Sequence, residues 1–257
     1  MPSFVEDLFN LEGRVALVTG ASSGIGRHMA MVLAAAGANL VIVGRDQGRL
    51  SETADEITSL DYEAVALPAD LQMREDVERV ATESAIPFGS PDILVNAAGI
   101  NLREPAEDIS WETWNQTQHI NMSVPFFLAR TLVGGMRGKG GGNIINIASL
   151  QSYRAFANSA AYGASKGGIV QLTRAMAEAW SSDGVVSNAI APGFFPTELT
   201  KSVFDNPKLL AANAAKTAIG RNGMMDDLDG ATIFLASRAS SYITGQVLSV
   251  DGGFTAK

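Results

Sequence analysis

The sequence predicts an α/β fold in one domain, a doubly wound sheet of about seven parallel strands with helices on both faces. Three observations lead to this prediction. Short apolar runs alternate with segments of helical periodicity along the whole chain. The first apolar run ends in a glycine-rich turn. No stretch rich in proline, serine or charge divides the 257 residues, a length that single α/β domains commonly reach.

The apolar runs are expected to be strands buried on both faces, because their hydrophobic residues are nearly continuous. They occupy residues 14–20, 39–43, 64–70, 92–96, 143–149, 185–191 and 246–250. Helices are expected between them, around residues 25–36, 46–57, 74–84, 111–136, 160–181 and 226–236. Strands and helices alternating at this interval imply right-handed crossovers and parallel pairing.

One interval breaks this alternation. Residues 193–225 include Pro196 and Pro207 and show only a weak helical signal around residues 209–216. Long irregular segments in compact domains are often lids or binding loops. We therefore expect a substrate lid at about 193–225 within a single domain that spans residues 1–257.

Composition argues against several classes of protein. The formal net charge is −8 without a cluster of Lys and Arg, which disfavours nucleic acid and anionic membranes as partners. With no cysteine and only His28 and His119, neither disulfides nor a metal site are expected. The acidic N-terminal segment is unlike a secretory signal, and Gly37 and Asn39 interrupt the longest apolar stretch. We expect a cytoplasmic protein with a small-molecule substrate.

The first glycine-rich turn, TGASSGIG, predicts a dinucleotide site. Small residues between a strand and a helix let the backbone approach a pyrophosphate, and the helix N-terminus supplies free N–H groups. The spacing is GxxxGxG, unlike the more common GxGxxG. Its position after the first strand indicates a Rossmann-type fold. The residues expected to contact the cofactor here are Gly20, Ser22, Ser23, Gly24, Ile25 and Gly26.

The choice between NADP and NAD is predicted from the end of the second strand. Arg45 stands where a basic side chain suits the 2′-phosphate of NADP, whereas an acidic one would bind the ribose of NAD. NADP is therefore the preferred cofactor. NAD is the alternative if Arg45 is an ordinary surface residue and Asp46 binds the ribose. Asp70, followed by Leu71, is placed to accept from the adenine amino group or to cap a helix.

A serine, a tyrosine and a lysine within residues 149–166 form the expected catalytic group. Tyr162 and Lys166 are four residues apart and project from one face of a helix. A lysine ammonium beside a phenol favours the phenolate, so we expect it to lower the pKa of Tyr162. Pro125 has no N–H for the carbonyl of Asn121, four residues earlier. This carbonyl should bend the helix and hold an ordered water.

Five motifs in this order resemble the short-chain dehydrogenase/reductase family. They are TGASSGIG, the NAAG at residues 96–99, Ser149, the YGASK at residues 162–166 and the PGFFPT at residues 192–197. The resemblance covers essentially the whole chain. It implies that the enzyme transfers a hydride between NAD(P) and a secondary alcohol or ketone.

The resemblance also implies roles for single residues. Tyr162 would be the general acid/base, Ser149 would hydrogen-bond the substrate oxygen, Lys166 would bind the nicotinamide ribose, and Asn121 would anchor a water connected to Lys166. The family's usual NNAG is NAAG here, with Ala97 in place of an asparagine. Further cofactor contacts are implied for Asn96, Ala97, Gly99, Tyr162, Lys166, Pro192, Gly193 and Thr197.

Substrate identity is predicted from the segments after Ser149 and Asn96. NAAGINLRE and IASLQSYRA resemble sugar-acid dehydrogenases of the family that act on gluconate and deoxygluconate. Substrate contacts are expected from Arg103, Arg154 and Phe194, and cations there or at Lys201 would suit a carboxylate.

Two other functions fit parts of the pattern. A 3-oxoacyl-[acyl-carrier-protein] reductase shares nearly all the motifs, although its partner favours an extended basic strip that the sequence lacks. A non-catalytic NADP(H)-sensing protein would be marked by loss of the serine, tyrosine or lysine, and all three are present. The family resemblance further implies a homotetramer built from the helices at 111–136 and 160–181 and the C-terminal strand.

Overall fold

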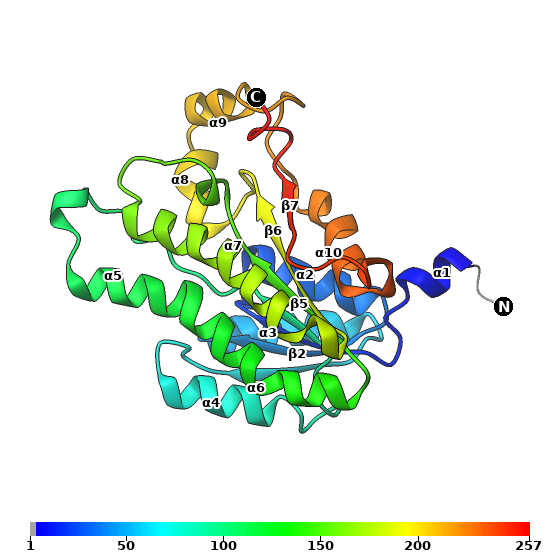
Figure 1. Cartoon of the computed structure of the whole chain (residues 1–257). Coiled ribbons are helices and arrows are strands. Elements are labelled where there is room, and N and C mark those ends of the chain that lie inside the picture. The colour runs from blue at the N-terminus through cyan, green and yellow to red at the C-terminus, as the bar shows by residue number, and fades with distance from the viewer. Residues whose placement is uncertain (1–3) are drawn as a thin grey trace.

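A parallel sheet forms the centre of the computed structural model, which describes residues 4–257 (Figure 1). Its order is β3-β2-β1-β4-β5-β6-β7, and each neighbouring pair is parallel. The predicted doubly wound sheet is therefore confirmed, while residues 1–3 of the predicted domain lie outside the described part. The strands are β1 Val15–Thr19, β2 Asn39–Gly44, β3 Ala64–Pro68, β4 Ile93–Asn96, β5 Gly142–Ile147, β6 Val185–Pro192 and β7 Val247–Val250.

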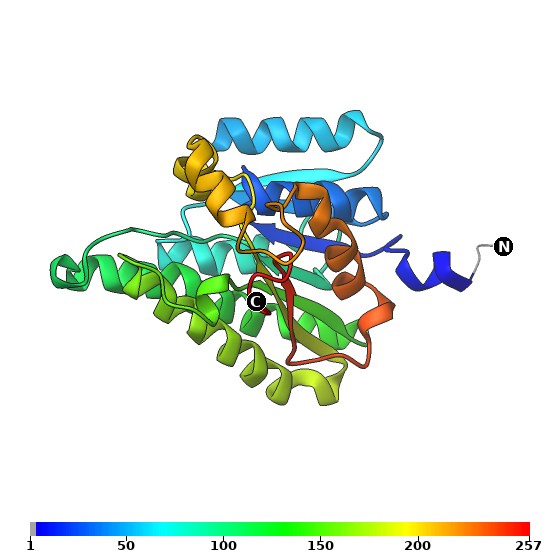
Figure 2. The same ribbon diagram turned by 90° about the horizontal axis from the view of Figure 1, so that it is seen from above.

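Helices cover both faces of the sheet, as expected (Figure 2). Side chains of α2, α3 and α10 pack on one face, and those of α4, α6 and α7 pack on the other. Between residues 4 and 257, no helix is both long and apolar enough to cross a membrane. The helices are α1 Phe4–Phe9, α2 Gly24–Ala35, α3 Gln47–Ser59, α4 Arg74–Glu83, α5 Trp111–Gln118, α6 Val124–Gly138, α7 Ala160–Trp180, α8 Lys201–Phe204, α9 Pro207–Ala214 and α10 Asp229–Ala236.

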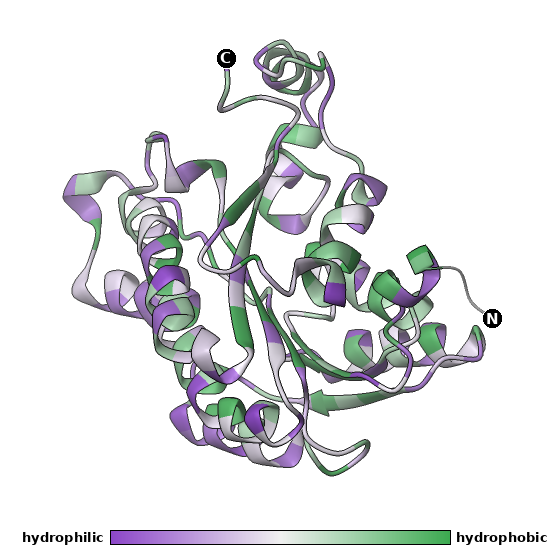
Figure 3. Ribbon diagram, turned by 45° about the vertical axis from the view of Figure 1, so that its right-hand side comes forward, coloured by the Kyte–Doolittle hydropathy of each residue, from purple (hydrophilic) through white to green (hydrophobic). Residues whose placement is uncertain are grey.

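The strands explain why the apolar runs are nearly continuous. All of β1 is buried, with Ala16 and Val18 packed in the core on one face and Val15 and Leu17 in the core on the other. Because successive side chains of a strand point to opposite faces, a sheet covered on both sides needs apolar residues at every position. Figure 3 shows these hydrophobic strands at the centre, with polar segments mainly on the outer helices.

The predicted helix at 111–136 is interrupted. Between α5 and α6, residues His119–Ser123 form a π-helix, in which Val124 N donates to the carbonyl of His119. Pro125 then lies in the first turn of α6, where its missing N–H costs little. The proline thus marks the bend correctly, but the backbone responds by widening a turn rather than by curving smoothly.

The interval predicted to be irregular contains two helices, α8 and α9, and is more regular than expected. Asn206 caps α9 by accepting hydrogen bonds from the N–H groups of Lys208 and Leu209, and Pro207 occupies the first turn. An asparagine followed by proline is a recognised helix start, so the sequence contained this signal. In Figure 1 both helices lie beyond the carboxyl end of β6, near the C-terminus.

Candidate active site

A cavity of about 610 Å³ opens at the carboxyl edge of the sheet. Open α/β sheets bind ligands at this edge, where the strand order reverses between β1 and β4. Most residues predicted for cofactor, catalysis or substrate line this cavity. They are Gly20, Ser22, Ser23, Gly24, Ile25, Gly26, Arg45, Asp70, Leu71, Ala97, Gly99, Arg103, Ser149, Tyr162, Lys166, Pro192, Gly193, Phe194 and Thr197.

The glycine turn fits a dinucleotide phosphate. Gly20 and Gly24 have φ of +68° and +54°, and a Cβ on Gly20 would lie 2.8 Å from the backbone of Ala98. Ser23, at the start of α2, makes no capping hydrogen bond with its side chain, so its hydroxyl does not occupy the first-turn N–H groups. Close backbone packing and an open helix N-terminus are what a pyrophosphate requires.

The NAAG segment is held by a residue that we did not predict. Thr19 Oγ1 accepts hydrogen bonds of 3.1 Å from the N–H groups of both Ala97 and Ala98. Ala97 therefore keeps the turn beside the cofactor site although it lacks an asparagine side chain. Asn96, in contrast, does not line the cavity: it is 3% exposed, and its Nδ2 donates to Asn146 Oδ1.

The end of β2 presents Arg45 at the cavity, exposed to solvent. Asp46, the alternative ligand for the ribose, accepts a hydrogen bond from Arg49 N at 3.1 Å and so caps α3. Its carboxylate is therefore already engaged. Arg49 is a second cation at the cavity wall and pairs with Glu198 at 2.7 Å. Asp70 lines the cavity, and its Oδ1 accepts from Gln72 N at 3.1 Å. The N-cap of α4 is Met73, so the expectation that Asp70 caps this helix is wrong.

The serine, tyrosine and lysine meet at the inner end of the cavity. Lys166 Nζ lies 5.5 Å from the centre of the Tyr162 ring and donates to Ile147 O at 2.7 Å. A hydrogen bond joins Tyr162 to Ser149, whose Oγ also accepts from Gln151 N at 3.1 Å. The helical spacing thus places Tyr162 and Lys166 as predicted, with the serine facing them from the segment after β5.

The electrostatics of this group differ from the prediction. Burial raises the pKa of Tyr162, and the hydrogen bond from Ser149 and the charge of Arg103 only partly lower it. Burial also lowers the pKa of Lys166 to about 8. The prediction that Lys166 lowers the pKa of Tyr162 is therefore wrong for this arrangement, because burial disfavours the charged form of both groups. The four-residue spacing of the two side chains does not reveal their burial.

Asn121 lies behind the cavity and not in its wall. Its side chain is 1% exposed and makes three hydrogen bonds. Oδ1 accepts from Ile100 N and Nδ2 donates to Ile100 O, both at 3.0 Å, and Nδ2 also donates to Ser165 Oγ at 2.9 Å. Ser165 in turn donates to Tyr162 O at 2.7 Å. Asn121 thus ties the segment after NAAG to the helix that carries the tyrosine.

Of the three predicted cations, one lies at the site. Arg103 lines the cavity and its charge acts on Tyr162. Arg154 instead donates to Lys257 O at 2.8 Å, which is a contact with the C-terminal segment. Lys201 pairs with Asp205 at 2.6 Å. The groups that a long basic side chain contacts depend on which segments of the fold pack beside it. Sequence position alone does not predict these neighbours.

The sequence reasoning missed polar residues at the substrate end of the cavity. Asn101 and Gln151 line it, and a carboxamide oxygen of each is buried without a hydrogen-bond partner. The available signal was their position in the segments after Asn96 and Ser149, to which we assigned substrate choice without naming them.

Comparison with known proteins decides the family. A family model described as enoyl-(acyl carrier protein) reductase matches residues 20–255. Gluconate 5-dehydrogenase of Gluconobacter oxydans (strain 621H) is 39% identical over 254 residues, which are 97% of each chain. The chain belongs to the short-chain dehydrogenase/reductase family. The predicted resemblance is thereby confirmed, and with it an NAD(P)-dependent oxidoreductase.

Two further proteins are similar to this chain over nearly their full length. The 2-dehydro-3-deoxy-D-gluconate 5-dehydrogenase of Escherichia coli (strain K12) is 37% identical and is matched over 97% of this chain and 98% of its own. The crystal structure of a gluconate 5-dehydrogenase from Burkholderia cenocepacia J2315, in complex with NADP and tartrate, superposes with a TM-score of 0.93. It is 37% identical, with 98% of this chain and 99% of that chain covered.

Lys166→Met should stabilise the unliganded protein at pH 7, because it removes a buried amine. The unfolded state binds more protons between the folded pKa of about 8 and the ordinary value of 10.5, so the lysine's contribution to stability improves as pH rises through that window. We expect roughly 2 kcal/mol at pH 7, after an allowance for the hydrogen bond lost at Ile147. Urea unfolding of the wild type and the variant at pH 7 and pH 9.5 measures this difference in the free energy of unfolding. A difference of the same size at both pH values would contradict the lowered pKa of Lys166.

Proposed function

We propose that this enzyme interconverts a secondary alcohol and a ketone on a sugar acid, with NADP preferred over NAD. The observation that carries the proposal is the grouping of Ser149, Tyr162 and Lys166 in the same cavity as the glycine turn, with the cation Arg103 beside the tyrosine. A carboxylate held by Arg103 would put a hydroxyl-bearing carbon of the substrate against the tyrosine.

The residues of this chain suit proton transfer at the reacting oxygen. Ser149 accepts from Gln151 N, which leaves its own hydrogen for the tyrosine or a substrate oxygen. In the reduction, Tyr162 Oη donates its proton to the ketone oxygen, and in the oxidation its deprotonated form takes the proton from the alcohol. Lys166 and Asn121 hold the helix and the NAAG segment in position around it. NADP bound along the glycine turn would supply or accept the hydride at its nicotinamide ring.

A carrier-protein substrate is the second candidate, because the matching family model is described as enoyl-(acyl carrier protein) reductase. Such a substrate requires a basic docking surface around the cavity mouth. Arg154 and Lys201 are each engaged with other groups, and Arg49 pairs with Glu198. These three cations are thus engaged by other groups, while Arg45 and Arg103 stay at the cavity without an ion pair to another described residue. Two separate cations favour a small anionic substrate over an acidic protein.

Oxidation of a panel of D-gluconate, 2-deoxygluconate, galactitol and a 3-hydroxyacyl thioester, each with NADP and NAD, tests the proposal. We expect the sugar acids to have the highest kcat/KM.

Arg103→Gln should raise KM for the acids about tenfold, while the KM for galactitol, which has no carboxylate, should change little. Tyr162→Phe should lower kcat by about 10³-fold or more on every substrate, with NADP binding intact. A higher kcat/KM for the thioester than for the sugar acids would contradict the proposed sugar-acid substrate.

Arg45→Asp should reverse the cofactor preference. The arginine lies at the cavity wall after β2, where its guanidinium would pair with a 2′-phosphate, and an aspartate there would repel it and accept from a ribose hydroxyl. We expect kcat/KM with NADP to fall at least about tenfold relative to NAD. Arg74→Asp, which makes the same charge change on α4 outside the cavity lining, serves as the control. An unchanged cofactor ratio would count against Arg45.

We propose that residues 193–225 act as the lid over the substrate. Several contacts support this role. Thr197 lies over the glycine turn, with its Cγ2 3.3 Å from where a Cβ of Gly24 would be. Lys257 Nζ donates to Ala215 O at 2.9 Å, so the C-terminal segment holds the far end of the lid. Arg154 holds that same segment to the loop after Ser149.

Arg154→Ala should loosen this clasp. We expect faster amide exchange at residues 215–217 and 251–257 and a substrate KM raised several-fold, because the lid would close less often. Arg174→Ala, an exposed arginine on α7 outside both cavities, should leave exchange and KM unchanged. Unaltered exchange in Arg154→Ala would show that the tail does not restrain the lid.

We further propose a cytoplasmic homotetramer. Support for the assembly comes from large apolar side chains exposed on the elements expected to pair, namely Trp111 at 83%, Phe127 at 42% and Leu248 at 39%. Apolar surface of this kind is commonly buried between subunits. Light scattering on the purified protein gives the mass that tests it.

A further inference from the structure

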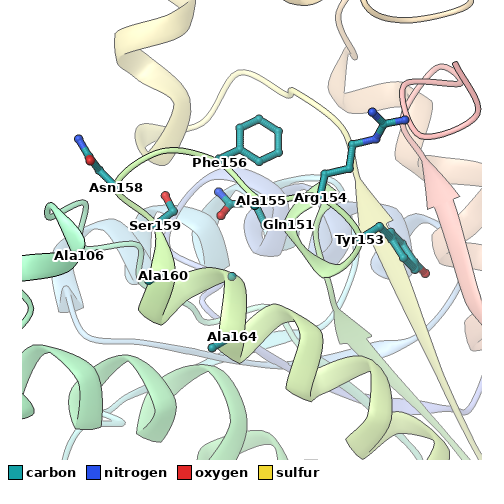
Figure 4. A pocket seen from close by; sticks show the side chains of 11 residues that line it. Ala106, Gln151, Tyr153, Arg154, Ala155, Phe156, Asn158, Ser159, Ala160 and Ala164 are labelled. Carbon is teal, nitrogen blue, oxygen red and sulfur yellow. The ribbon is translucent and has the colours of Figure 1, made fainter.

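A second cavity, of about 460 Å³, lies beside the catalytic one (Figure 4). It is bounded by Ala106, by the loop at residues 151–159 and by the first turns of α7. Gln151 and Phe156 line both cavities, so these two side chains form a shared wall. The second cavity therefore adjoins the catalytic one at these two side chains, which a longer substrate would have to pass.

Two residues that line this second cavity each have a side-chain oxygen without a hydrogen-bond partner. Ser159 Oγ and Gln151 Oε1 are both buried, and Ser159 as a whole is 4% exposed. Buried polar atoms are nearly always paired, so two orphans lining one cavity need an explanation. A ligand with hydroxyl groups would satisfy both.

Neither oxygen serves the fold. Ser159 precedes α7, where a serine usually caps the helix, yet its side chain makes no capping bond. Gln151 Oε1 points toward Gly163 of α7, where an added Cβ would lie 3.6 Å away. The side-chain hydroxyl and amide oxygen are thus held in the cavity without a structural task.

We infer that the second cavity is a substrate subsite, in which Ser159 and Gln151 hydrogen-bond the hydroxylated carbon chain beyond the reacting carbon. This inference rests on the proposed function and names two further specificity residues for it. The amide oxygen of Gln151 only accepts, so it selects a hydroxyl and disfavours a carboxylate. Arg154, the cation in this lining, already donates to Lys257 O and Thr255 O.

The rest of the lining agrees with such an occupant. Ala155, Phe156, Ala160 and Ala164 present apolar surface to the cavity. Each carbon of a polyol chain carries a C–H group beside its hydroxyl, so a lining with apolar side chains and two polar ones could contact both. With the carboxylate at Arg103, the substrate would extend from that cation past the tyrosine to Ser159.

Ser159→Ala and Gln151→Leu test the subsite with D-gluconate and galactitol as long substrates and propan-2-ol as a short one without further hydroxyls. We expect KM for the long substrates to rise about 3–10-fold in each variant, since one hydrogen bond is lost, with propan-2-ol kcat/KM unchanged. Ser159→Ala should keep or raise Tm, because it removes an unpaired buried hydroxyl and no capping bond. A merely structural serine would lower Tm instead.

Ala157→Ser is the matched control. Ala157 lies in the same loop, is exposed and lines neither cavity. It should leave every KM unchanged. If the wild type oxidises gluconate or galactitol and neither test variant alters the long-to-short ratio, the subsite is overturned and the proposed function stands. A changed oligomeric mass with that unaltered ratio would assign the cavity to an interface between copies. A wild type inactive on both long substrates overturns the proposed function and the subsite together.

Discussion

The site depends on how the first turns of α7 are fixed to the end of β5. Lys166 Nζ donates to Ile147 O, and Lys166 O accepts from Ser152 Oγ at 2.5 Å, so one residue is bound at both its side chain and its backbone. These bonds set the distance between Tyr162 on the helix and Ser149 after the strand. Burying an amine for this purpose lowers its pKa and weakens the folded state near neutral pH. The fold therefore sacrifices some stability to hold the tyrosine and the serine together.

Several polar atoms without partners lie near this fixed group. Asn101, Gln151 and Ser159 each leave an oxygen unpaired at or beside the catalytic cavity. Asn96, Glu104 and Asn222 each leave a buried oxygen unpaired outside the two cavity linings. The amide of Asn121, in contrast, makes three hydrogen bonds. A protein core favours complete pairing, because an orphaned buried group costs free energy that only a ligand can return. An unpaired oxygen together with a place in a cavity lining is therefore the combination that supports a substrate contact at Asn101, Gln151 and Ser159.

The sequence predicted the parts whose signal is local. The strands follow from apolar runs, because a sheet covered on both faces requires them, and the turn at Gly20 follows from the backbone conformation that glycine allows. What failed depends on tertiary surroundings. Burial reversed the direction of the Tyr162 pKa, and the C-terminal segment engaged Arg154. The π-helix at His119–Ser123 was predicted in part. Pro125 indicated where the long helix would be interrupted, but the sequence did not indicate that the interruption would be a π-helix.

The proposed lid is restrained from three directions, and this has a consequence for how the enzyme would close. Thr197 lies over the cofactor turn, Glu198 pairs with Arg49 of α3 at the cofactor wall, and Lys257 holds Ala215 from the C-terminal side. The first two contacts adjoin the cofactor site, whereas the third leads through Arg154 to the loop that carries Gln151 and Ser159. Closure would therefore respond to both ligands, because each displaces or orders a different support of the same segment.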